Sequence, residues 1–529
     1  MGKTRLMDVP ASRAENLGTL RETRPWDVLI IGGGASGLGA AVDAAARGYR
    51  TLLVEARDFA SGTSSCSTKL IHGGVRYLRQ GDFALVRNAL RERSYLLANA
   101  AHLVHPLAFV IPAWRNVDRV IYAAGLKLYD VLSGGHNLAA SRSLDWQEVI
   151  AALPGLRRAG LCGGIRYWDG QFDDARLAIT LMRTATDLGA TCLNYLPATR
   201  LLKTDGRVVG AVLRDAECGQ EFEVSARAVV NATGVHADSV RRLDEPGVAP
   251  LLTPSQGIHL VFDADFLPGQ QALMIPETED GRVMFAIPWQ GKVLLGTTDT
   301  PRPELAQLDD PQPLAAEINF LLRTAARVLT RPPTRADIRS VFAGLRPLIH
   351  PDSTDHQSTA ALSREHAVLV SASGLITVAG GKWTTYRLMA EDVIDRAAEV
   401  AGLPAEPCPT RVLKLHGCPA QPGSNGYGTD APLLASLPGH DRPLHPALPY
   451  SEAMVRFAIR HEAARTIEDV LARRTRALFH DARAAEAAIE RVAGIFAEEL
   501  KLSPEEVATM IDAACESARR FMPALELAG

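Results

Sequence analysis

One short stretch of this chain gathers residue types that bind anions and move protons. Residues 66–78 read CSTKLIHGGVRYL, in which Lys69, His72, Arg76 and Tyr77 surround a glycine pair. Ammonium and guanidinium groups bind phosphate, and an imidazole gives or takes a proton near neutral pH. The stretch has neither a helical nor a strand period, so its composition alone is also typical of a solvated loop.

Upstream, residues 27–56 form a strand–helix–strand unit with a dinucleotide-binding fingerprint. Gly32, Gly34 and Gly37 make a G-x-G-x-x-G turn between the strand DVLII and a small-residue helix expected over 36–47. The first glycine permits the tight turn, the second lets backbone approach a pyrophosphate, and the third lets the helix pack closely on the sheet. The helix N-terminus favours phosphate, and Glu55 can accept hydrogen bonds from ribose hydroxyls. This unit alone does not distinguish FAD from NAD.

Two later pieces favour FAD. RAVVNATG (227–234) is a buried strand that ends in Ala-Thr-Gly, and GLITVAGGKWTTYR (374–387) is a strand, a glycine turn and a helix start. In two-domain flavoproteins such pieces return to the first domain, one near the adenosine half and the other along the ribityl chain and the flavin edge. An NAD domain, in contrast, is complete within one contiguous stretch.

The remaining patterns predict a further sheet and a helical C-terminus. Residues 195–230 alternate as a three-stranded antiparallel meander, and a helix over 174–188 is expected with Asp173 as its N-cap. Strand runs within 255–300 suit a mixed sheet over the flavin, Pro/Gly-rich residues 403–450 are typical of a linker, and helical spacing continues from there to residue 523.

Bulk composition excludes several classes of function. A chain of 529 residues, 47% hydrophobic and 22% charged, is globular and long enough for two or three domains. A net charge of −3 gives no basic field for nucleic acid. Seven scattered cysteines without a CxxC pair argue against a disulfide framework, a metal site or an iron–sulfur cluster. The N-terminus has no signal-peptide pattern, and no apolar run is long enough to span a bilayer.

The strings reached so far resemble those of the FAD-dependent sn-glycerol-3-phosphate dehydrogenases, in family order and over roughly residues 25 to 520. They are GTSSCSTKLIHGGVRYL (62–78), DGQFDDARL (169–177), NATG (231–234), FAIPW (285–289), GTTDT (296–300), AGLRPL (343–348), GGKWTTYR (380–387) and RHEAARTIEDVLARRTRALF (460–479). The resemblance implies oxidation of sn-glycerol 3-phosphate to dihydroxyacetone phosphate by hydride transfer to FAD.

The resemblance also implies an α/β architecture of the D-amino-acid-oxidase-like type. We expect a Rossmann-like FAD-binding domain, a substrate domain built on a mixed or antiparallel sheet, and a C-terminal all-α domain. The expected boundaries are a polar extension (1–24), the FAD-binding domain (25–100, 160–254 and 340–400), the substrate domain (101–159 and 255–339), a linker (401–450) and the helical domain (451–529).

Transferred onto matching positions, the family pattern assigns substrate and catalytic roles. Arg76, Arg346 and Arg364 are candidates for the phosphate, although Arg346 could instead lie nearer the hydroxyl or the developing carbonyl. His259 is favoured slightly as the base that takes the hydroxyl proton, and His72 as a residue that orients substrate or flavin. Further candidates are Tyr77 as a hydrogen-bond donor to the substrate, Thr298 and Asp299 in shaping the site or flanking it, and Lys382 beside the flavin edge or the substrate.

Lys382 stands at a helix start, where the helix dipole disfavours a cation, so a function must compensate. The expected FAD contacts are Gly32, Gly34, Ser36, Gly37, Glu55, Ser64, Ser65, Thr68, Lys69, Gly73, Gly74, Ala232, Thr233, Gly234, Gly381, Lys382, Thr384 and Thr385. Two positions depart from the family pattern: Trp383 stands where leucine is common, and Gln256 where many members have lysine.

The electron acceptor and the location follow from one amphipathic pattern and from the resemblance. A helix over 117–132 would place Val117, Val120, Ile121, Ala124, Leu128, Val131 and Leu132 on one face, with Arg115, Arg119 and Lys127 on or beside the other. This pattern suits either a helix packed on the core or one lying in a membrane interface. The resemblance favours peripheral binding at the cytoplasmic face of the cell membrane, a quinone acceptor and possibly a homodimer.

Three other functions fit parts of the sequence. A glycerol-3-phosphate oxidase would pass its electrons to oxygen and release peroxide, but no inserted middle segment typical of such oxidases is evident. An amino-acid oxidase of the same fold needs a carboxylate site and does not explain several arginines with the HGG string. A flavin-binding regulatory or tRNA-modifying protein would need a basic surface or a reactive cysteine, and nothing marks Cys66 as such a thiol.

Overall fold

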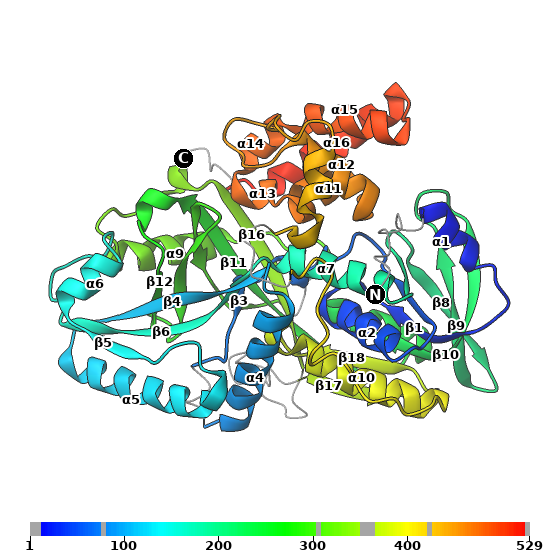
Figure 1. Cartoon of the computed structure of the whole chain (residues 1–529), viewed down its shortest axis with the longest axis horizontal. Coiled ribbons are helices and arrows are strands. Elements are labelled where there is room, and N and C mark those ends of the chain that lie inside the picture. The colour runs from blue at the N-terminus through cyan, green and yellow to red at the C-terminus, as the bar shows by residue number, and fades with distance from the viewer. Residues whose placement is uncertain (1–11, 76–80, 303–307, 350–365, 420–425, 524–529) are drawn as a thin grey trace, which may run out of the picture.

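Two β-sheets and a group of C-terminal helices make up the part of the chain that the structure describes (Figure 1). The structure is a computed structural model and describes residues 12–75, 81–302, 308–349, 366–419 and 426–523. The C-terminal helices lie at one end of the molecule in this view, and helix α5 (Asn116–Ser133) runs along the opposite edge.

The first sheet is the dinucleotide-binding sheet. Its strands are β1 (Trp26–Ile31), β2 (Thr51–Val54), β7 (Thr191–Leu193), β8 (Ala198–Thr204), β9 (Arg207–Arg214), β10 (Glu221–Asn231), β17 (His366–Val370) and β18 (Ile376–Gly380). The order is β17-β18-β10-β1-β2-β7, and the four pairings from β18 to β7 are parallel. The expected meander is confirmed, because β8 and β9 pair antiparallel through a two-residue turn at Asp205 and Gly206, both with positive φ.

Helices cover this sheet. They are α1 (Arg13–Thr19), α2 (Ala35–Ala46), α7 (Asp174–Asp187), α8 (Ala237–Asp244) and α10 (Tyr386–Ala401). The sequence predicts α2, α7 and the start of α10, whereas α1 lies within the stretch expected as a polar extension. Helix α2 packs against both α7 and α10, and its small residues from Gly37 to Ala45 are buried. Asp173 caps α7 as expected, since its side chain accepts a hydrogen bond from the backbone N–H of Arg176.

The second sheet is longer and mostly antiparallel. It contains β3 (Leu70–Ile71), β4 (Val104–Ala113), β5 (Arg142–Leu144), β6 (Gly163–Phe172), β11 (Leu252–Asp263), β12 (Ala272–Ile275), β13 (Met284–Trp289), β14 (Lys292–Gly296), β15 (Thr300–Pro301) and β16 (Ser340–Ile349). Helices α4 (Phe83–Asn99), α5, α6 (Trp146–Ala152) and α9 (Ala315–Val328) accompany it. No helix among the described residues is both long enough and apolar enough to cross a membrane.

The expected domain boundaries need a correction at three strands. Residues 25–100, 160–254 and 340–400 were assigned to the FAD-binding domain, yet β3, β6 and β16 within them belong to the second sheet. Strand β6 pairs with β4 over its whole length, and β16 does the same with β11. The neighbour with which a strand pairs decides its sheet, and these partners lie far away in the sequence.

The C-terminal region is helical as expected. It contains α11 (Ala431–Ser436), α12 (Glu452–His461), α13 (Ala477–His480), α14 (Ala482–Ala487), α15 (Ile489–Leu500) and α16 (Pro504–Arg520). Helix α11 falls within the stretch expected as a linker. The region shares one hydrophobic core with the second sheet, because Phe342 of β16 packs against Phe479 of α13.

Candidate functional site

A cavity of about 610 Å³ lies between the two sheets and is lined from both of them. Its walls come from the glycine turn after β1, the end of β2, residues 60–75, the loop after β10, strands β11 and β16, and the turn after β18. Segments more than 300 residues apart therefore meet around one space. This is large enough for an extended cofactor with a small substrate at one end.

The glycine turn builds one end of this cavity by close backbone contacts. Gly32 has φ +114°, and a Cβ there would lie 2.6 Å from the carbonyl oxygen of Ala232. A Cβ on Gly37 would collide with the carbonyl oxygen of Gly32. Gly34 is the N-cap of α2 and supplies no side-chain cap, while the Ser64 hydroxyl accepts a hydrogen bond from the N–H of Ala35 at 2.9 Å. Ser64 thus occupies the first N–H of α2, and the following N–H groups of the first turn suit a phosphate.

Glu55 stands beside this turn, where a ribose is expected. Its carboxylate accepts hydrogen bonds from the backbone N–H groups of Gly33 at 2.6 Å and Arg57 at 2.9 Å. Burial raises the pKa of Glu55, and these two donors partly oppose that shift. The two backbone contacts fix the carboxylate at the cavity wall, where it lines the space.

The opposite end is built on the antiparallel pair β11 and β16. His259 pairs with Phe342, and Gly257 pairs with Gly344, so alternate residues of both strands face the same side. Arg346 lies on that face too, and its guanidinium covers Gly257, where a Cβ would approach Nη1 to 2.8 Å. The sheet therefore presents an imidazole and a guanidinium side by side, with a glycine between them that leaves room for the arginine.

His259 is buried and held in one orientation. Its ring stacks on Phe342 with centroids 5.0 Å apart, and Nε2 lies 3.0 Å from the hydroxyl oxygen of Thr68. Its Nδ1 is buried and has no hydrogen-bond partner among the described residues. Burial lowers the pKa of His259 well below its usual value, and the positive charges of Lys69 and Arg346 lower it further. The imidazole is therefore neutral at physiological pH, and these same effects make it a weaker base than an exposed histidine.

Arg346 is held in place by the loop after β14. Its Nη1 lies 3.2 Å from Oδ1 of Asp299, and its Nη2 donates to the carbonyl oxygen of Thr298 at 3.1 Å. The Ser255 hydroxyl donates to the same Asp299 oxygen. Behind the loop, buried Glu317 of α9 accepts a hydrogen bond from the Thr298 hydroxyl at 2.8 Å. The arginine is thus oriented by a carboxylate that is itself fixed.

Gln256, which departs from the family pattern, joins the same support. Its amide nitrogen donates to Glu317 at 2.7 Å, and its amide oxygen accepts from Arg302 at 2.8 Å. It is fully buried on the face of β11 away from the cavity, so it acts behind the site.

The turn after β18 closes the cavity on the side of residues 72–74, which are called the HGG stretch below. Thr384 accepts a hydrogen bond from the N–H of His72 at 3.2 Å and lies 3.3 Å from its carbonyl oxygen. Lys382 is half-buried, lines the cavity and precedes the 3-10 turn that leads into α10. Trp383 donates its indole N–H to the carbonyl oxygen of Ser64 at 3.0 Å. The indole therefore ties this turn to the segment opposite.

Lys69 is placed differently from the expectation of an FAD contact. It adopts φ +63°, which turns its side chain away from the cavity, and it is fully buried. Its ammonium donates to Asp174 at 2.6 Å and to the carbonyl oxygen of Ser65 at 2.7 Å. Burial lowers the pKa of Lys69 to about 8 although Asp174 opposes that shift. The lysine supports the loop from behind.

Most residues singled out in the sequence meet in this cavity. Those that line it are Gly32, Gly34, Ser36, Glu55, Ser64, Thr68, His72, Gly74, Ala232, Thr233, Gly234, His259, Arg346, Gly381, Lys382 and Thr384. Described residues that lie behind its walls are Gly37, Ser65, Lys69, Gly73, Thr298 and Thr385. Arg76, Tyr77 and Arg364 lie outside the described residues.

Two carboxylates shape the site, and the sequence did not predict the role of either. Asp169 lines the cavity at the end of β6, and Asp299 orients Arg346 from the loop after β14. Both lie in strings quoted above, DGQFDDARL and GTTDT. An acidic residue near the end of a strand within such a string is the sequence feature from which these two carboxylates could have been predicted. Cys66 also lines the cavity, and burial raises the pKa of its thiol, so it is no reactive thiolate.

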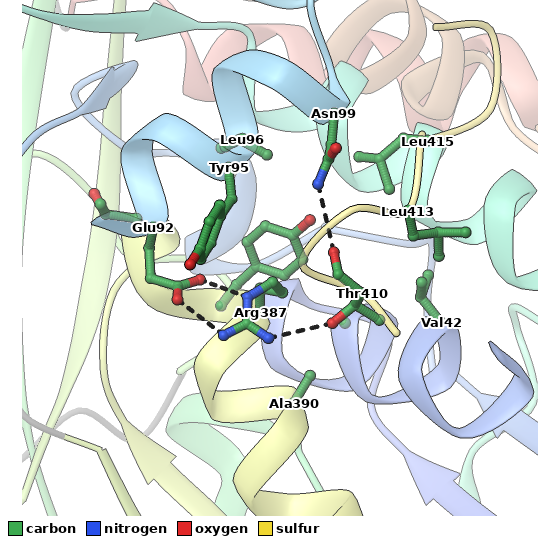
Figure 2. A pocket seen from close by; sticks show the side chains of 13 residues that line it. Val42, Glu92, Tyr95, Leu96, Asn99, Arg387, Ala390, Thr410, Leu413 and Leu415 are labelled. Atoms are coloured by element: carbon green, nitrogen blue, oxygen red, sulfur yellow. Dashed lines mark hydrogen bonds and ion pairs between the residues drawn. The ribbon is translucent and has the colours of Figure 1, made fainter. Parts of the chain in front are cut away.

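A second pocket of about 20 Å³ lies between α2, α4 and α10 and shares Thr384 with the large cavity (Figure 2). Arg387 forms two hydrogen bonds with the carboxylate of Glu92, at 2.7 and 2.8 Å, and contacts the Thr410 hydroxyl at 3.3 Å. The space holds about one water molecule. This buried ion pair connects α4 to α10, so the residues around the small pocket stabilise the packing of helices beside the site.

The residues of the large cavity fit a flavin dinucleotide. Backbone N–H groups at the α2 N-terminus suit a pyrophosphate, Glu55 suits a ribose, and the cavity continues as far as Lys382 and His259. A cation at that far end suits the edge of a flavin that gains negative charge on reduction. No group of three or more metal-ligating side chains occurs within the described ranges.

Comparison with known proteins agrees with this geometry. Residues 27–387 match the family described as FAD dependent oxidoreductase, and residues 377–507 match the C-terminal domain of alpha-glycerophosphate oxidase. The chain is 40% identical to the mitochondrial glycerol-3-phosphate dehydrogenase of Homo sapiens, over 97% of this chain and 75% of that protein. The Mus musculus protein of the same name is also 40% identical, over 93% of this chain and 73% of its own length.

Solved structures show the same fold. The glycerol-3-phosphate dehydrogenase from Bacillus halodurans complexed with FAD superposes with a TM-score of 0.79 at 29% identity, over 98% of this chain and 99% of that one. An L-alpha-glycerophosphate oxidase from Mycoplasma pneumoniae with FAD bound has a TM-score of 0.56 at 17% identity, over 76% and 98% of the two chains. At that lower identity the likeness concerns the fold alone.

Proposed function

Because the chain belongs to the FAD-dependent glycerol-3-phosphate dehydrogenase family, we propose that its cavity oxidises glycerol 3-phosphate to dihydroxyacetone phosphate and that a membrane quinone takes the electrons. Its cofactor is FAD, and its activity is that of an FAD-dependent glycerol-3-phosphate dehydrogenase. When bound, FAD accepts the hydrogen of the carbinol carbon together with its electron pair.

The residues of this chain supply binding and proton transfer. Arg346 holds the substrate at its phosphate, or at the oxygen that becomes the carbonyl, with a guanidinium oriented by Asp299. His259 takes the proton of the secondary hydroxyl, since it is neutral and lies on the same face of the sheet. Lys382 offers positive charge at the flavin end of the cavity.

His259 is the better candidate for the base than His72. The His259 ring lies on strand β11 and stacks on Phe342 of the paired strand β16, so its position is set mainly by the sheet. His72 lines the cavity from the segment that Thr384 holds by its backbone, which suits an orienting role.

One observation carries this proposal: His259 and Arg346 share a face of the second sheet at one end of a cavity whose other end is the glycine turn. Anaerobic mixing of the purified protein with glycerol 3-phosphate tests it. We expect the visible flavin absorption band to bleach, and glycerol without the phosphate to bleach it far more slowly. A flavin that stays oxidised with glycerol 3-phosphate would overturn the assignment.

We base the proposal of a membrane quinone as electron acceptor on the outer face of helix α5. Five apolar side chains point to solvent there, with Val131 75% and Val120 67% exposed, and Val117, Ile121 and Leu128 beside them. The inner face of the same helix is buried at Leu126 and Tyr129. Water disfavours such a continuous exposed apolar stripe, whereas the interface of a bilayer accommodates it, with Arg115 and Lys127 near its edges for anionic lipids.

Vesicle binding tests the membrane part separately. A Val120→Glu, Val131→Glu double variant should lose cosedimentation with anionic phospholipid vesicles and reduction of a membrane quinone, yet keep flavin bleaching by glycerol 3-phosphate. Val412→Glu is the matched control, because Val412 is 79% exposed and does not belong to α5. Equal vesicle binding by both variants would remove α5 from the interface. Substantial peroxide release in air would favour oxygen over a quinone.

The remaining partner and residue assignments are proposals from family resemblance alone. They are a homodimer, which light scattering after size-exclusion chromatography measures, and substrate contacts by Arg76, Tyr77 and Arg364, which alanine substitutions would test through the KM for glycerol 3-phosphate.

A further inference from the structure

A chain of buried hydrogen bonds runs from α5 to the HGG stretch beside the cavity. The backbone N–H of Gly73 donates to the Tyr129 hydroxyl oxygen at 2.9 Å. The Tyr129 hydroxyl lies 2.9 and 3.0 Å from the two carboxylate oxygens of Asp169. Arg93 of α4 donates to the same carboxylate at 2.6 Å and also holds the carbonyl oxygen of His136 at 3.0 Å.

Chemistry fixes the direction of this chain. An ionised carboxylate can only accept, so the single Tyr129 proton goes to Asp169 and the phenol oxygen is left to accept from Gly73. Burial raises the pKa of Tyr129 well above its usual value, which keeps that proton in place. Arg93 is fully buried and supplies the charge that Asp169 needs in this setting. Every member of the chain therefore has a partner.

Gly73 is required where it meets this chain. A Cβ on Gly73 would collide with the Tyr129 hydroxyl oxygen and lie 2.8 Å from the Leu90 side chain. Its neighbours His72 and Gly74 line the cavity, whereas Gly73 lies behind the wall. The phenol thus holds a residue that lies behind the cavity wall, between two residues that line the cavity.

We propose that Tyr129, held by Asp169 and Arg93, is a positioning residue that fixes the Gly73 backbone and thereby the cavity wall next to the flavin and the substrate. Thr384 holds His72 from one side, and Tyr129 holds Gly73 from the other. Tyr129 belongs to a regular helix packed against β4 and β6, so the support is rigid. No route through Tyr129 to the reacting atoms is needed for this role.

Tyr129→Phe removes only the hydroxyl and keeps the ring. Its matched control is Tyr195→Phe, because the Tyr195 hydroxyl also donates to a buried carboxylate, Asp469 at 2.6 Å, and neither residue lines the cavity. Both variants lose a hydrogen bond to a buried carboxylate, and Tyr129→Phe also loses the bond from the Gly73 N–H, so Tyr129→Phe should lose at least as much thermal stability as Tyr195→Phe. Only Tyr129→Phe should speed amide hydrogen exchange in a peptide that covers residues 70–75, change the visible circular dichroism of the flavin, and lower kcat about tenfold per bound FAD.

The exchange measurement separates this inference from the proposed function, on which its kinetic part rests. Failure of the wild-type protein to oxidise glycerol 3-phosphate would overturn the proposed function and leave the exchange result standing. Loss of FAD by Tyr129→Phe but not by Tyr195→Phe would support positioning. Unchanged exchange at residues 70–75 together with wild-type kcat in Tyr129→Phe would overturn the inference.

Discussion

Arg346→Ala is the substitution that most directly tests how this cavity holds its substrate. The arginine lies on β16 above Gly257 and is oriented by Asp299 and by the carbonyl oxygen of Thr298. Alanine removes the guanidinium and leaves the strand pairing intact, since the backbone of β16 pairs with β11 along its whole length. FAD binding should therefore persist, because the glycine turn lies at the other end of the cavity.

The expected loss follows from the kind of contact removed. A hydrogen bond to a charged group contributes about 1.5–3 kcal/mol, and a guanidinium facing a phosphate or a developing oxyanion offers one or two of them. The Arg346 side chain is 23% exposed, so solvent weakens each contact somewhat. A total of about 2–4 kcal/mol corresponds to a fall in kcat/KM of roughly 30- to 900-fold. Arg346→Lys keeps the positive charge but loses the two-pronged hydrogen bonding of the guanidinium, so its kcat/KM should lie between those of the wild-type protein and Arg346→Ala.

Steady-state kinetics with glycerol 3-phosphate and with glycerol distinguish the two roles left open for Arg346. If the guanidinium binds the phosphate, the loss appears with glycerol 3-phosphate and is small with glycerol. If it lies at the oxygen that becomes the carbonyl, both substrates lose the same factor, mainly in kcat. Arg339→Ala is the control, since Arg339 directly precedes β16 and pairs with Asp263 outside the cavity. Wild-type kinetics in FAD-loaded Arg346→Ala would refute the reasoning.

Three further outcomes are expected. Lys69→Met should cost about 3–5 kcal/mol in urea unfolding, because it strips Asp174 of its closest cation inside the core, and a loss below 1 kcal/mol would contradict the buried pair. Burial lowers the pKa of His259 in the folded state, so below about pH 6.5 the unfolded chain binds a proton at this residue that the folded chain does not. The wild-type protein should therefore lose more thermal stability than His259→Gln when the pH falls from neutral. Parallel curves of melting temperature against pH for the two proteins would contradict this expectation. Trp383→Leu should weaken FAD retention on dialysis, because it removes the indole hydrogen bond to Ser64, and unchanged retention would show that the bond is dispensable.

The first sheet could be predicted well because its signals are local. The strand before Gly32, the turn itself and the helix after it follow one another, and each carries its own pattern of apolar and small residues. The Asp173 cap of α7 acts within a single turn of helix, so it can be predicted from a few neighbouring residues. The residues around His259 and Arg346 were reached through family strings, and the structure brings both to one cavity.

The errors arose where geometry is set by distant partners. Strands β6 and β16 could not be assigned from adjacent sequence, because their pairing partners decide their sheet. Lys69 stands among residues that line the cavity, but its left-handed backbone turns the side chain toward Asp174, more than 100 residues away. Thr298 belongs to the loop after β14 that borders the site, as predicted. Its hydroxyl, however, donates to Glu317, and Thr297 lines the cavity instead. The direction in which such a side chain points is set by a single φ angle or by the strand register, and the spacing of residues in the sequence predicts neither.

Two buried carboxylates of the FAD-binding half depend on the C-terminal helices. Arg474 and Arg473 both contact Asp58, which follows β2 and Glu55 in the chain, and against the effect of burial they hold the pKa of Asp58 at about 2. Arg476 donates to Asp174, the partner of Lys69.

A carboxylate that loses its buried partner costs several kcal/mol, and a typical domain has only about 5–15 kcal/mol of stability in total. Arg476 also donates to the carbonyl oxygen of Ser65 at 2.8 Å, directly behind the residues that line the cavity. The C-terminal region is therefore part of the support of the cofactor site. A chain ended after α10 would keep every residue of the glycine turn and of the β11–β16 face, and would still lack the cations that let the segment between them fold.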